Sequence, residues 1–595
     1  MTTARMRQMT PYMFLAPAAA IMFVGLLYPV GYMIYASFLD WNPSQRIGEA
    51  DWVNFRNYFS LLQDESFRES TIVTLKFSSI VVSTEMIVGV GLALLLDRNI
   101  RGISVLRTIF ILPMMIAPIV VGLMWRYMYH PSVGTFNRTL KDWGLEPIPW
   151  LSDSGWALTS IIIADIWQWT PFIFILALAA LQSLPRSALE AARIDGASGW
   201  QQILHIKLPL MMPVLVVTLL LRLIDSFKVL EVILVMTNGG PGLSTEILSL
   251  RIARTASEFR ELGVAAAMSN YLLLLLLALT IIMFVYNKVV EAREAAVREA
   301  AEEAYGMNTN YERQNPAFYA LIAALVLMSI APIYLMLSTS FRLNVDIMSE
   351  TSSLLFFPTL QNYETVLCNV LWYEPAHLDY CDPTFGRALG SSLLVALIST
   401  GITLVVGCMA AYALVRFRFM GRGTMSMTTL MMRMVPPAVL LVPVFGIWTF
   451  QYQLDGTYAG IILVYVAMNL PFVIWILQSF IIQVPIQLEE AARMDGANAL
   501  QVFFLVVLPV IKPGLAAASI FTFRIAWNEF LIANALLDRN TRTVPVTIVN
   551  SLTEYDIDWG VIMATGMLLA IPPIIFTFVA SKQIITGMTA GAVKG

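Results

Sequence analysis

Long apolar stretches recur along this chain and constrain its fold more than any other feature. About twelve of them reach the length of roughly 20 residues that an α-helix needs to cross the hydrocarbon core of a bilayer. The composition agrees, because 58% of the 595 residues are hydrophobic and 13% are charged, whereas a soluble domain has about 25% charged residues. The sequence therefore predicts an all-α membrane protein with about twelve transmembrane helices in the lipid bilayer.

The predicted spans fall into two sets of six. The first six are predicted at residues 11–38, 70–96, 105–128, 157–181, 208–236 and 263–286. The second six are predicted at residues 317–340, 387–415, 425–450, 459–482, 508–533 and 559–581. Because each set contains an even number of spans, both sets start on the same side of the membrane and form parallel repeats about an axis along the membrane normal.

One octet occurs twice and identifies the two sets as copies of one unit. Glu190-Ala-Ala-Arg-Ile-Asp-Gly-Ala197 returns 300 residues later as Glu490-Ala-Ala-Arg-Met-Asp-Gly-Ala497, with one position changed. The glycine suits the end of a short helix, and Ser198 or Asn498 suits the cap of a second one. Each octet therefore predicts two short helices joined at a glycine, outside the membrane and before the fifth span.

A charged segment separates the two sets of spans. It contains Glu291-Ala-Arg-Glu-Ala-Ala-Val-Arg-Glu-Ala-Ala-Glu-Glu303, which we interpret as part of a cytoplasmic helical linker at residues 287–315. The linker divides the chain into a first half, residues 1–286, and a second half, residues 316–595. Gly306-Met307 is also consistent with a joint between two formerly separate chains.

Lysine and arginine in the short loops predict the orientation. The relevant arginines are Arg5 and Arg7 at the N-terminus, Arg98, Arg101 and Arg107 after the second span, and Arg416, Arg418 and Arg422 after its counterpart. Basic residues mark the cytoplasmic side, so both termini and both octets are predicted to be cytoplasmic in a multi-pass protein of the cell inner membrane. The first apolar run is too long for a cleaved signal peptide and is predicted to be retained.

The octet and its surroundings resemble a known family. The pattern Glu-Ala-Ala, three residues, Gly, nine residues, an aliphatic residue, one residue and Leu-Pro resembles the cytoplasmic loop of type I ABC importer permeases. Further motifs resemble the carbohydrate subfamily, which includes maltose- and glycerol-phosphate-like systems: Trp167-Gln-Trp-Thr-Pro171, Thr237-Asn-Gly-Gly-Pro241, Arg416-Phe-Arg-Phe419, Trp527-Asn-Glu-Phe530 and the tail from Gly587 to Gly595. The first half looks like the larger permease subunit and the second half like the smaller one, fused in one chain with the MetI-like type I permease fold.

The resemblance implies partners and docking residues. In this family the loop forms a coupling helix that docks on an ABC ATPase dimer, which binds ATP and Mg. The docking residues implied here are Glu190, Ala191, Ala192, Asp195 and Gly196, with Glu490, Ala491, Ala492, Asp495 and Gly496. A separate extracytoplasmic solute-binding protein would deliver a carbohydrate-like solute. The chain itself has no P-loop sequence, so we expect a permease with no cofactor and no catalytic residues, and not an enzyme.

Ionisable residues inside predicted spans are candidates for the solute cavity, since charge in a membrane is costly. They are Lys76, Glu85, Asp165, Arg222, Asp225, Lys228, Glu231, Arg433, Arg524 and Glu529. A sugar site is expected at mid-depth, where the fifth spans meet. The predicted solute-binding residues are Trp167, Gln168, Phe227, Glu231, Trp527, Asn528 and Glu529. Two structural alternatives are local pairs of Asp225 with Arg222 or Lys228, and pairing of Glu231 or Glu529 with Arg222 or Arg524.

Several kinds of chemistry are disfavoured by the composition. Three cysteines and three histidines without Cys-x-x-Cys spacing do not suggest a metal site or a disulfide scaffold. Cys368 and Cys381 share one predicted outer loop and can pair in an oxidising compartment. A net charge of −3 without a basic stripe argues against nucleic acid as a partner.

Two other functions are compatible with parts of the sequence. A secondary active transporter of about twelve helices would explain the helix number and the buried charges, but not the paired octets. An ABC permease for ferric ion would explain the octets, but the carbohydrate-type tail argues against it. We therefore expect an ATP-driven import permease for a sugar, polyol or sugar-like solute.

Overall fold

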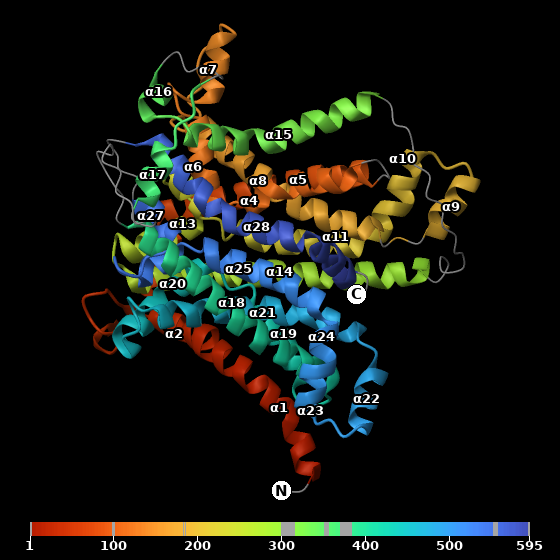
Figure 1. The fold of residues 1–595 in the computed structure, drawn as a ribbon. Coiled ribbons are helices and arrows are strands. Elements are labelled where there is room, and N and C mark those ends of the chain that lie inside the picture. The colour runs from red at the N-terminus through yellow and green to blue at the C-terminus, as the bar shows by residue number, and fades with distance from the viewer. Residues whose placement is uncertain are drawn as a thin grey trace.

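The computed structural model describes residues 3–97, 102–182, 184, 186–298, 316–349, 356–368, 384–550 and 557–592. Figure 1 shows a bundle of long helices, with short helices and loops gathered at its two ends. Within the described residues, the sheet is a single antiparallel pair in which Leu39 of β1 (Leu39–Asp40) lies opposite Trp52 of β2 (Asp51–Trp52).

The helical elements follow the two predicted halves. The first half contains α1 (Thr3–Met22), η1 (Phe23–Leu27), α2 (Tyr28–Ala36), η2 (Ile47–Glu49), α3 (Arg56–Gln63), α4 (Glu65–Leu96), α5 (Ile103–Met115), α6 (Pro118–Met128), α7 (Thr135–Asp142), α8 (Ser154–Gln182), α9 (Arg186–Ile194), α10 (Gly199–Gln202), η3 (Ile203–Lys207), α11 (Leu208–Ser226), α12 (Glu231–Met236), α13 (Leu248–Ser257) and α14 (Leu262–Arg298). The second half contains α15 (Pro316–Ser340), α16 (Asn344–Met348), α17 (Gln361–Leu367), α18 (Phe385–Arg416), α19 (Arg422–Met432), α20 (Pro437–Gly446), η4 (Ile447–Tyr452), α21 (Tyr458–Gln483), α22 (Ile486–Met494), α23 (Ala499–Val502), η5 (Phe503–Val507), α24 (Leu508–Val510), α25 (Lys512–Asn528), α26 (Leu531–Leu536), α27 (Val544–Asn550) and α28 (Trp559–Ala592).

The spans confirm the all-α membrane fold and correct its details. In the described residues, 9 helices are long and apolar enough to cross a membrane, or 11 when each of two bent pairs counts as one span. One bent pair, α5 with α6, turns by 92°. The twelfth predicted span, 425–450, is instead divided between α19 and α20. Pro118 and Pro437 begin the second helix of these two broken spans, because proline lacks the N–H needed to continue the first helix.

The second and fourth spans form the tightest helix pair of each half. In the first half α4 packs on α8, and in the second half α18 packs on α21. A methyl group at Gly89 would lie 2.7 Å from Ile173 Cγ2, and one at Gly407 would lie 2.7 Å from Val473 Cγ1. Glycine is therefore required at both crossings, which bring helix backbones close together as small residues do in membrane bundles.

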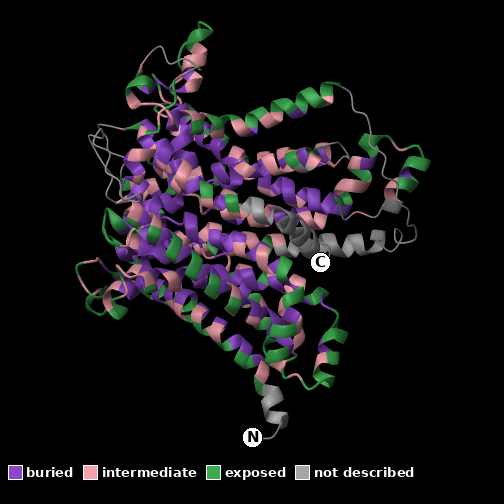
Figure 2. Cartoon of the chain, in the orientation of Figure 1, coloured by how far each residue is buried: buried purple, intermediate pink, exposed green. Residues whose placement is uncertain are grey.

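The first span of each half packs on the other half. Helix α1 contacts α18 and α21 of the second half, and α15 contacts α5 and α6 of the first half. Figure 2 shows buried residues in the middle of the bundle and many exposed residues along α15, which we interpret as its lipid-facing side. The exchange of first spans interlocks the halves.

A short asparagine-centred bridge is repeated in the two halves. Asn57 Nδ2 donates to the carbonyl of Ser37 at 2.9 Å, and Asn362 Nδ2 donates to the carbonyl of Ser340 at 2.9 Å. In both cases the bridge ties the helix before the second span to the end of the first. The halves are thus copies well beyond the octets.

The predicted division into halves is not tested by the fold. Helix α14 continues without a break from the sixth span to Arg298. The rest of the predicted linker, residues 299–315, lies outside the described residues, as do Arg98 and Arg101.

Candidate functional site

Both octets adopt the same helix–glycine–helix shape, which we call the coupling loops (residues 186–207 and 486–507). Gly196 and Gly496 end the first helix with φ of +79° and +87°. In each loop the N–H after this glycine donates to the carbonyl of the second octet alanine, at 2.9 Å and 3.0 Å. Ser198 and Asn498 then cap the second helix by accepting from the N–H three residues on. The local prediction from the octet therefore matches the structure.

The coupling loops present the same surface from the same end of the bundle (Figure 1). Ile194 and Met494, the one changed octet position, are each 87% exposed. Of the predicted docking residues, the exposed ones are Glu190, Ala191, Asp195, Gly196, Glu490, Ala491, Asp495 and Gly496. Ala192 is buried and Ala492 is half-buried. An apolar side chain on a charged, protruding loop is typical of a surface that another protein covers.

The two coupling loops are fastened to the bundle differently. In the second half, the buried carboxylate of Glu489 accepts from Arg416 Nε at 2.6 Å, at the end of α18. The corresponding position in the first half is Leu189. There the loop is held instead at Lys207, whose Nζ lies 3.7 Å from Asp97 Oδ2. Only the second loop thus has an ion pair on its first helix within the described residues.

A cavity of about 560 Å³ lies between the two halves. Its charged and amide lining residues are Asp165, Asp225, Lys228, Glu231, Arg433, Asn469, Arg524, Asn528 and Glu529. Its aromatic lining residues are Trp169, Phe172, Phe472, Trp475, Phe480 and Phe521. The cavity extends from Glu231 and Glu529 to Ser479 near the end of α21, which is the direction of the coupling loops.

Three predicted solute-binding residues line this cavity: Glu231, Asn528 and Glu529. Glu529 accepts from the hydroxyl of Tyr465 at 2.6 Å and from the N–H of Ile532 at 2.7 Å, so it also caps α26. The predicted alternative pairing of Glu231 or Glu529 with an arginine is not seen among the described residues.

The other four predicted solute-binding residues do not line the cavity. Phe227 is buried in the core. The three others donate to backbone carbonyls: Trp527 Nε1 to Leu569 at 3.0 Å, Gln168 Nε2 to Ile116 at 3.0 Å and Trp167 Nε1 to Ser329 at 3.2 Å. Side chains that satisfy buried backbone groups hold helices together, so solute contact by these four stays a prediction.

A fully buried ion cluster lies beside the cavity. Arg222 Nε donates to Glu85 Oε2 at 2.6 Å, and Arg222 Nη2 donates to Asp165. The pairing of Arg222 with Asp225, expected from their spacing, is therefore wrong. The pairing of Asp225 with Lys228 does form, with Lys228 Nζ 3.7 Å from Asp225 Oδ1. The cluster joins the second, fourth and fifth spans of the first half.

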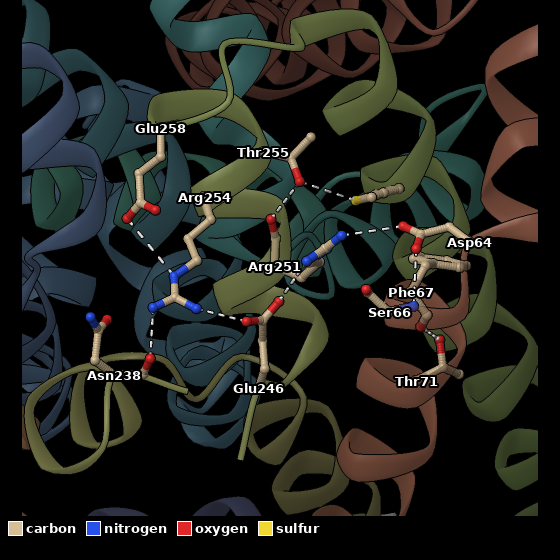
Figure 3. Close-up of polar contacts among 11 residues, drawn as sticks. Asp64, Ser66, Phe67, Thr71, Asn238, Glu246, Arg251, Arg254, Thr255 and Glu258 are labelled. Carbon is tan, nitrogen blue, oxygen red and sulfur yellow. Dashed lines mark hydrogen bonds and ion pairs between the residues drawn. The ribbon is translucent and has the colours of Figure 1, made fainter. Parts of the chain in front are cut away.

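A second charged network lies at the far end of the bundle, by which we mean the end opposite the coupling loops (Figure 3). The buried carboxylate of Glu246 accepts from Arg254 Nη1 at 2.6 Å and from Arg251 Nη1 at 3.2 Å. Arg254 also donates to the carbonyl of Asn238 at 2.6 Å, and Arg251 to Asp64 at 3.3 Å. The predicted turn at Asn238 is thereby held rigidly against α13 and the start of α4.

An apolar layer closes the cavity toward the far end. Helix α11 has 19 residues and so spans about 28 Å, which places α12 at the far end. Val232 and Ile233 of α12 pack with α6, while Ile532 and Ala533 of α26 pack with α20; all four are buried. We call these residues the far-end layer.

The cysteine prediction is only partly covered by the structure. Cys408 is a buried free thiol in α18, and Cys368 is buried directly after α17. Cys381 lies outside the described residues, so its pairing with Cys368 stays a prediction. Among the described residues, no group of three or more His, Cys, Asp or Glu side chains is placed to hold a metal ion.

Known proteins resemble the chain in both halves. The model of the family described as "binding-protein-dependent transport system inner membrane component" matches residues 86–296 and 403–588. The trehalose/maltose transport system permease protein MalF of Thermococcus litoralis is 38% identical over 46% of this chain and 91% of its own length. The sn-glycerol-3-phosphate transport system permease protein UgpA of Yersinia enterocolitica is 34% identical over 46% of this chain and 92% of its own length.

Among solved structures, a bacterial ABC transporter involved in the import of the acidic polysaccharide alginate is similar, with 24% identity and a TM-score of 0.43 over 47% of this chain and 96% of that one. The two family matches cover more than half of the 595 residues and include both coupling loops. The chain therefore belongs to the family of binding-protein-dependent transport system inner membrane components, and it is a transport permease with that family's domain present twice.

Proposed function

We propose that this chain forms the whole membrane pathway of an ATP-driven ABC importer for a sugar, polyol or related solute. The solutes named for its relatives, trehalose, maltose and sn-glycerol 3-phosphate, support this class. The cavity is large enough for such a solute and combines aromatic faces with amide and charged groups, as small-molecule sites do.

The energy comes from a separate ATPase dimer, which binds ATP and Mg and docks on the two coupling loops. The observation that carries this proposal is the equality of the loops, which share one backbone geometry, one end of the bundle and an 87% exposed apolar tip at Ile194 or Met494. Two equal protrusions suit two equal subunits of a dimer. Closure of the dimer on ATP pulls the loops together and rocks the halves about the cavity.

The solute-binding protein docks at the far end, which faces the outside. The network of Glu246, Arg251 and Arg254 makes that surface rigid, and a rigid surface loses little entropy on binding. In this orientation both termini and both coupling loops are cytoplasmic. The halves 1–286 and 316–595 then act as the two moving bodies, joined by the linker at 287–315.

The docking role is tested by charge reversal in the coupling loops. The chain is reconstituted in vesicles with its ATPase and binding protein, and solute uptake is measured for Glu190→Lys, Glu490→Lys and the double variant. Uptake is expected to fall at least about tenfold in the double variant, because like charges brought together at an interface cost several kcal/mol. Glu146→Lys, an exposed glutamate at the far end, is the control. Normal uptake in the double variant removes the docking proposal.

A further inference from the structure

Basic side chains outnumber the acidic side chain that serves them in one part of the cavity. Lys228, Arg433 and Arg524 all line it, and Asp225 is the carboxylate whose charge acts on all three. Within the described part of the chain, no carboxylate oxygen lies within 4.0 Å of the Arg433 or Arg524 guanidinium. This region therefore holds positive charge that the protein itself leaves uncompensated.

The two arginines are held by aromatic rings, which leaves their edges available. Arg433 lies over the ring of Phe472, with its central carbon 4.4 Å from the ring centroid. Arg524 lies over Trp169 at 5.1 Å and donates from Nη1 to the carbonyl of Met114 at 2.8 Å. Its Nε is buried without a hydrogen-bond partner. Stacking uses the face of a guanidinium, whereas carboxylate, sulfonate and phosphate groups bind its edge.

An amide in the same cavity also lacks partners. Asn528 lines the cavity and is 8% exposed, yet neither Nδ2 nor Oδ1 has a hydrogen-bond partner. Leaving buried polar atoms unpaired costs free energy, so a ligand that donates and accepts hydrogen bonds is favoured beside it. The hydroxyl groups of a sugar or polyol do both.

The other acidic side chains of the cavity are engaged or lie elsewhere. Asp165 accepts from Arg222, and Glu529 accepts from Tyr465 and the start of α26. Glu231 begins α12, in the part of the cavity that adjoins the far-end layer. None of these carboxylates forms an ion pair with Arg433 or Arg524 among the described residues.

We propose that the transported solute carries an anionic group, a carboxylate, sulfonate or phosphate on a sugar or polyol frame, and that Arg433 and Arg524 receive this group. Asn528 then binds a hydroxyl of the frame. The proposal rests on the proposed transport of a sugar-like solute and adds the charge of that solute. It also assigns a specificity role to two arginines that touch the solute.

Binding to the purified full-length chain tests the proposal without the ATPase. The chain is placed in nanodiscs of neutral phosphatidylcholine, so that no anionic lipid competes, and calorimetry compares two matched pairs. Methyl glucuronide is compared with methyl glucoside, and sn-glycerol 3-phosphate with glycerol. The anionic member of at least one pair is expected to bind at least about tenfold more tightly, as charge-assisted hydrogen bonds do. Arg433→Gln and Arg524→Gln should each remove that preference.

Two further variants separate recognition from folding. Arg433→Lys keeps the charge and should retain part of the preference, while Arg418→Gln changes an exposed arginine outside the cavity and should retain all of it. Equal or absent binding of both members in both pairs overturns the proposal, as does tight anion binding that survives both glutamine variants. Neutral sugars that bind and are imported overturn only the charge. Arginine-dependent anion binding without import by the full complex overturns only the proposed function.

Discussion

At the scale of single residues, the buried arginine of the fifth span is the most exposed to damage by mutation. The Arg222 side chain is 0% exposed and is paired with Glu85 and Asp165. Replacing it by Met should lower the free energy of unfolding by about 3–5 kcal/mol, because two carboxylates then remain buried without a counter-charge. Thermal unfolding of the purified chain measures the loss.

A surface pair provides the control for this prediction. Arg68 pairs with Glu65 at 2.9 Å, and both side chains are largely exposed. Arg68→Met should change the stability by at most about 1 kcal/mol, as exposed ion pairs contribute little. Equal stability losses in the two variants would show that burial does not set the importance of the Arg222 cluster.

The sequence identified the ionisable residues of the membrane but not their partners. All ten predicted candidates are described, and the three-residue spacing correctly predicted the pairing of Lys228 with Asp225. Arg222 instead pairs with residues 137 and 57 positions away, on α4 and α8. Pairing across helices depends on which helix faces meet, and spans that are apolar all round carry little periodic signal of this.

At the scale of elements, the ion pair on the second coupling loop is expected to transmit force. Glu489 joins the first helix of that loop to Arg416 at the end of α18. Glu489→Leu, which copies the residue at position 189, should loosen this joint and raise the number of ATP molecules hydrolysed per solute imported. The measurement is the ratio of the two rates in vesicles that contain the complete importer.

Exchange of the two charges distinguishes a joint from a merely stabilising contact. The double variant Glu489→Arg with Arg416→Glu restores an ion pair of reversed direction and should recover part of the normal ratio. Leu189→Gln alters the matching position of the first loop, where no such pair exists, and should leave the ratio unchanged. A normal ratio in Glu489→Leu itself argues against any role of the pair in coupling.

Local elements were more predictable than their connections. The coupling loops follow the sequence because a glycine at positive φ and a capping residue determine short helices locally. The broken third spans were predicted as continuous helices, although Pro118 and Pro437 give a signal at the breaks. The repeated Asn-Tyr pairs at 57–58 and 362–363 also mark the bridges that sequence comparison of the halves could have found.

At the scale of the whole molecule, orientation is the feature that can be tested most directly. Single cysteines are introduced as Trp143→Cys at the far end or Met494→Cys on a coupling loop, both at exposed positions, after Cys368, Cys381 and Cys408 are replaced by alanine. A membrane-impermeant maleimide should label the first in intact cells and the second only after cell disruption, as the arginine-rich loops predict. The opposite pattern reverses the orientation.

The two-fold plan was predictable, but the interlocking of the halves was not. The duplicated octet and the even number of spans predicted parallel repeats, and the structure repeats its tight helix crossings at Gly89 and Gly407. The packing of α1 and α15 on the opposite halves has no counterpart in the sequence pattern. Apolar residues lie all around α15, so its sequence does not indicate which neighbour it prefers.

The far-end layer has an electrical consequence. A continuous wet path through the chain would let ions flow down the membrane potential, which is worth about 2.3 kcal/mol per elementary charge at 100 mV. Val232, Ile233, Ile532 and Ala533 are buried and apolar, and the cavity stops below them. In this conformation the permease is therefore an insulator, and a cell can keep many idle copies in its membrane without discharging its ion gradients.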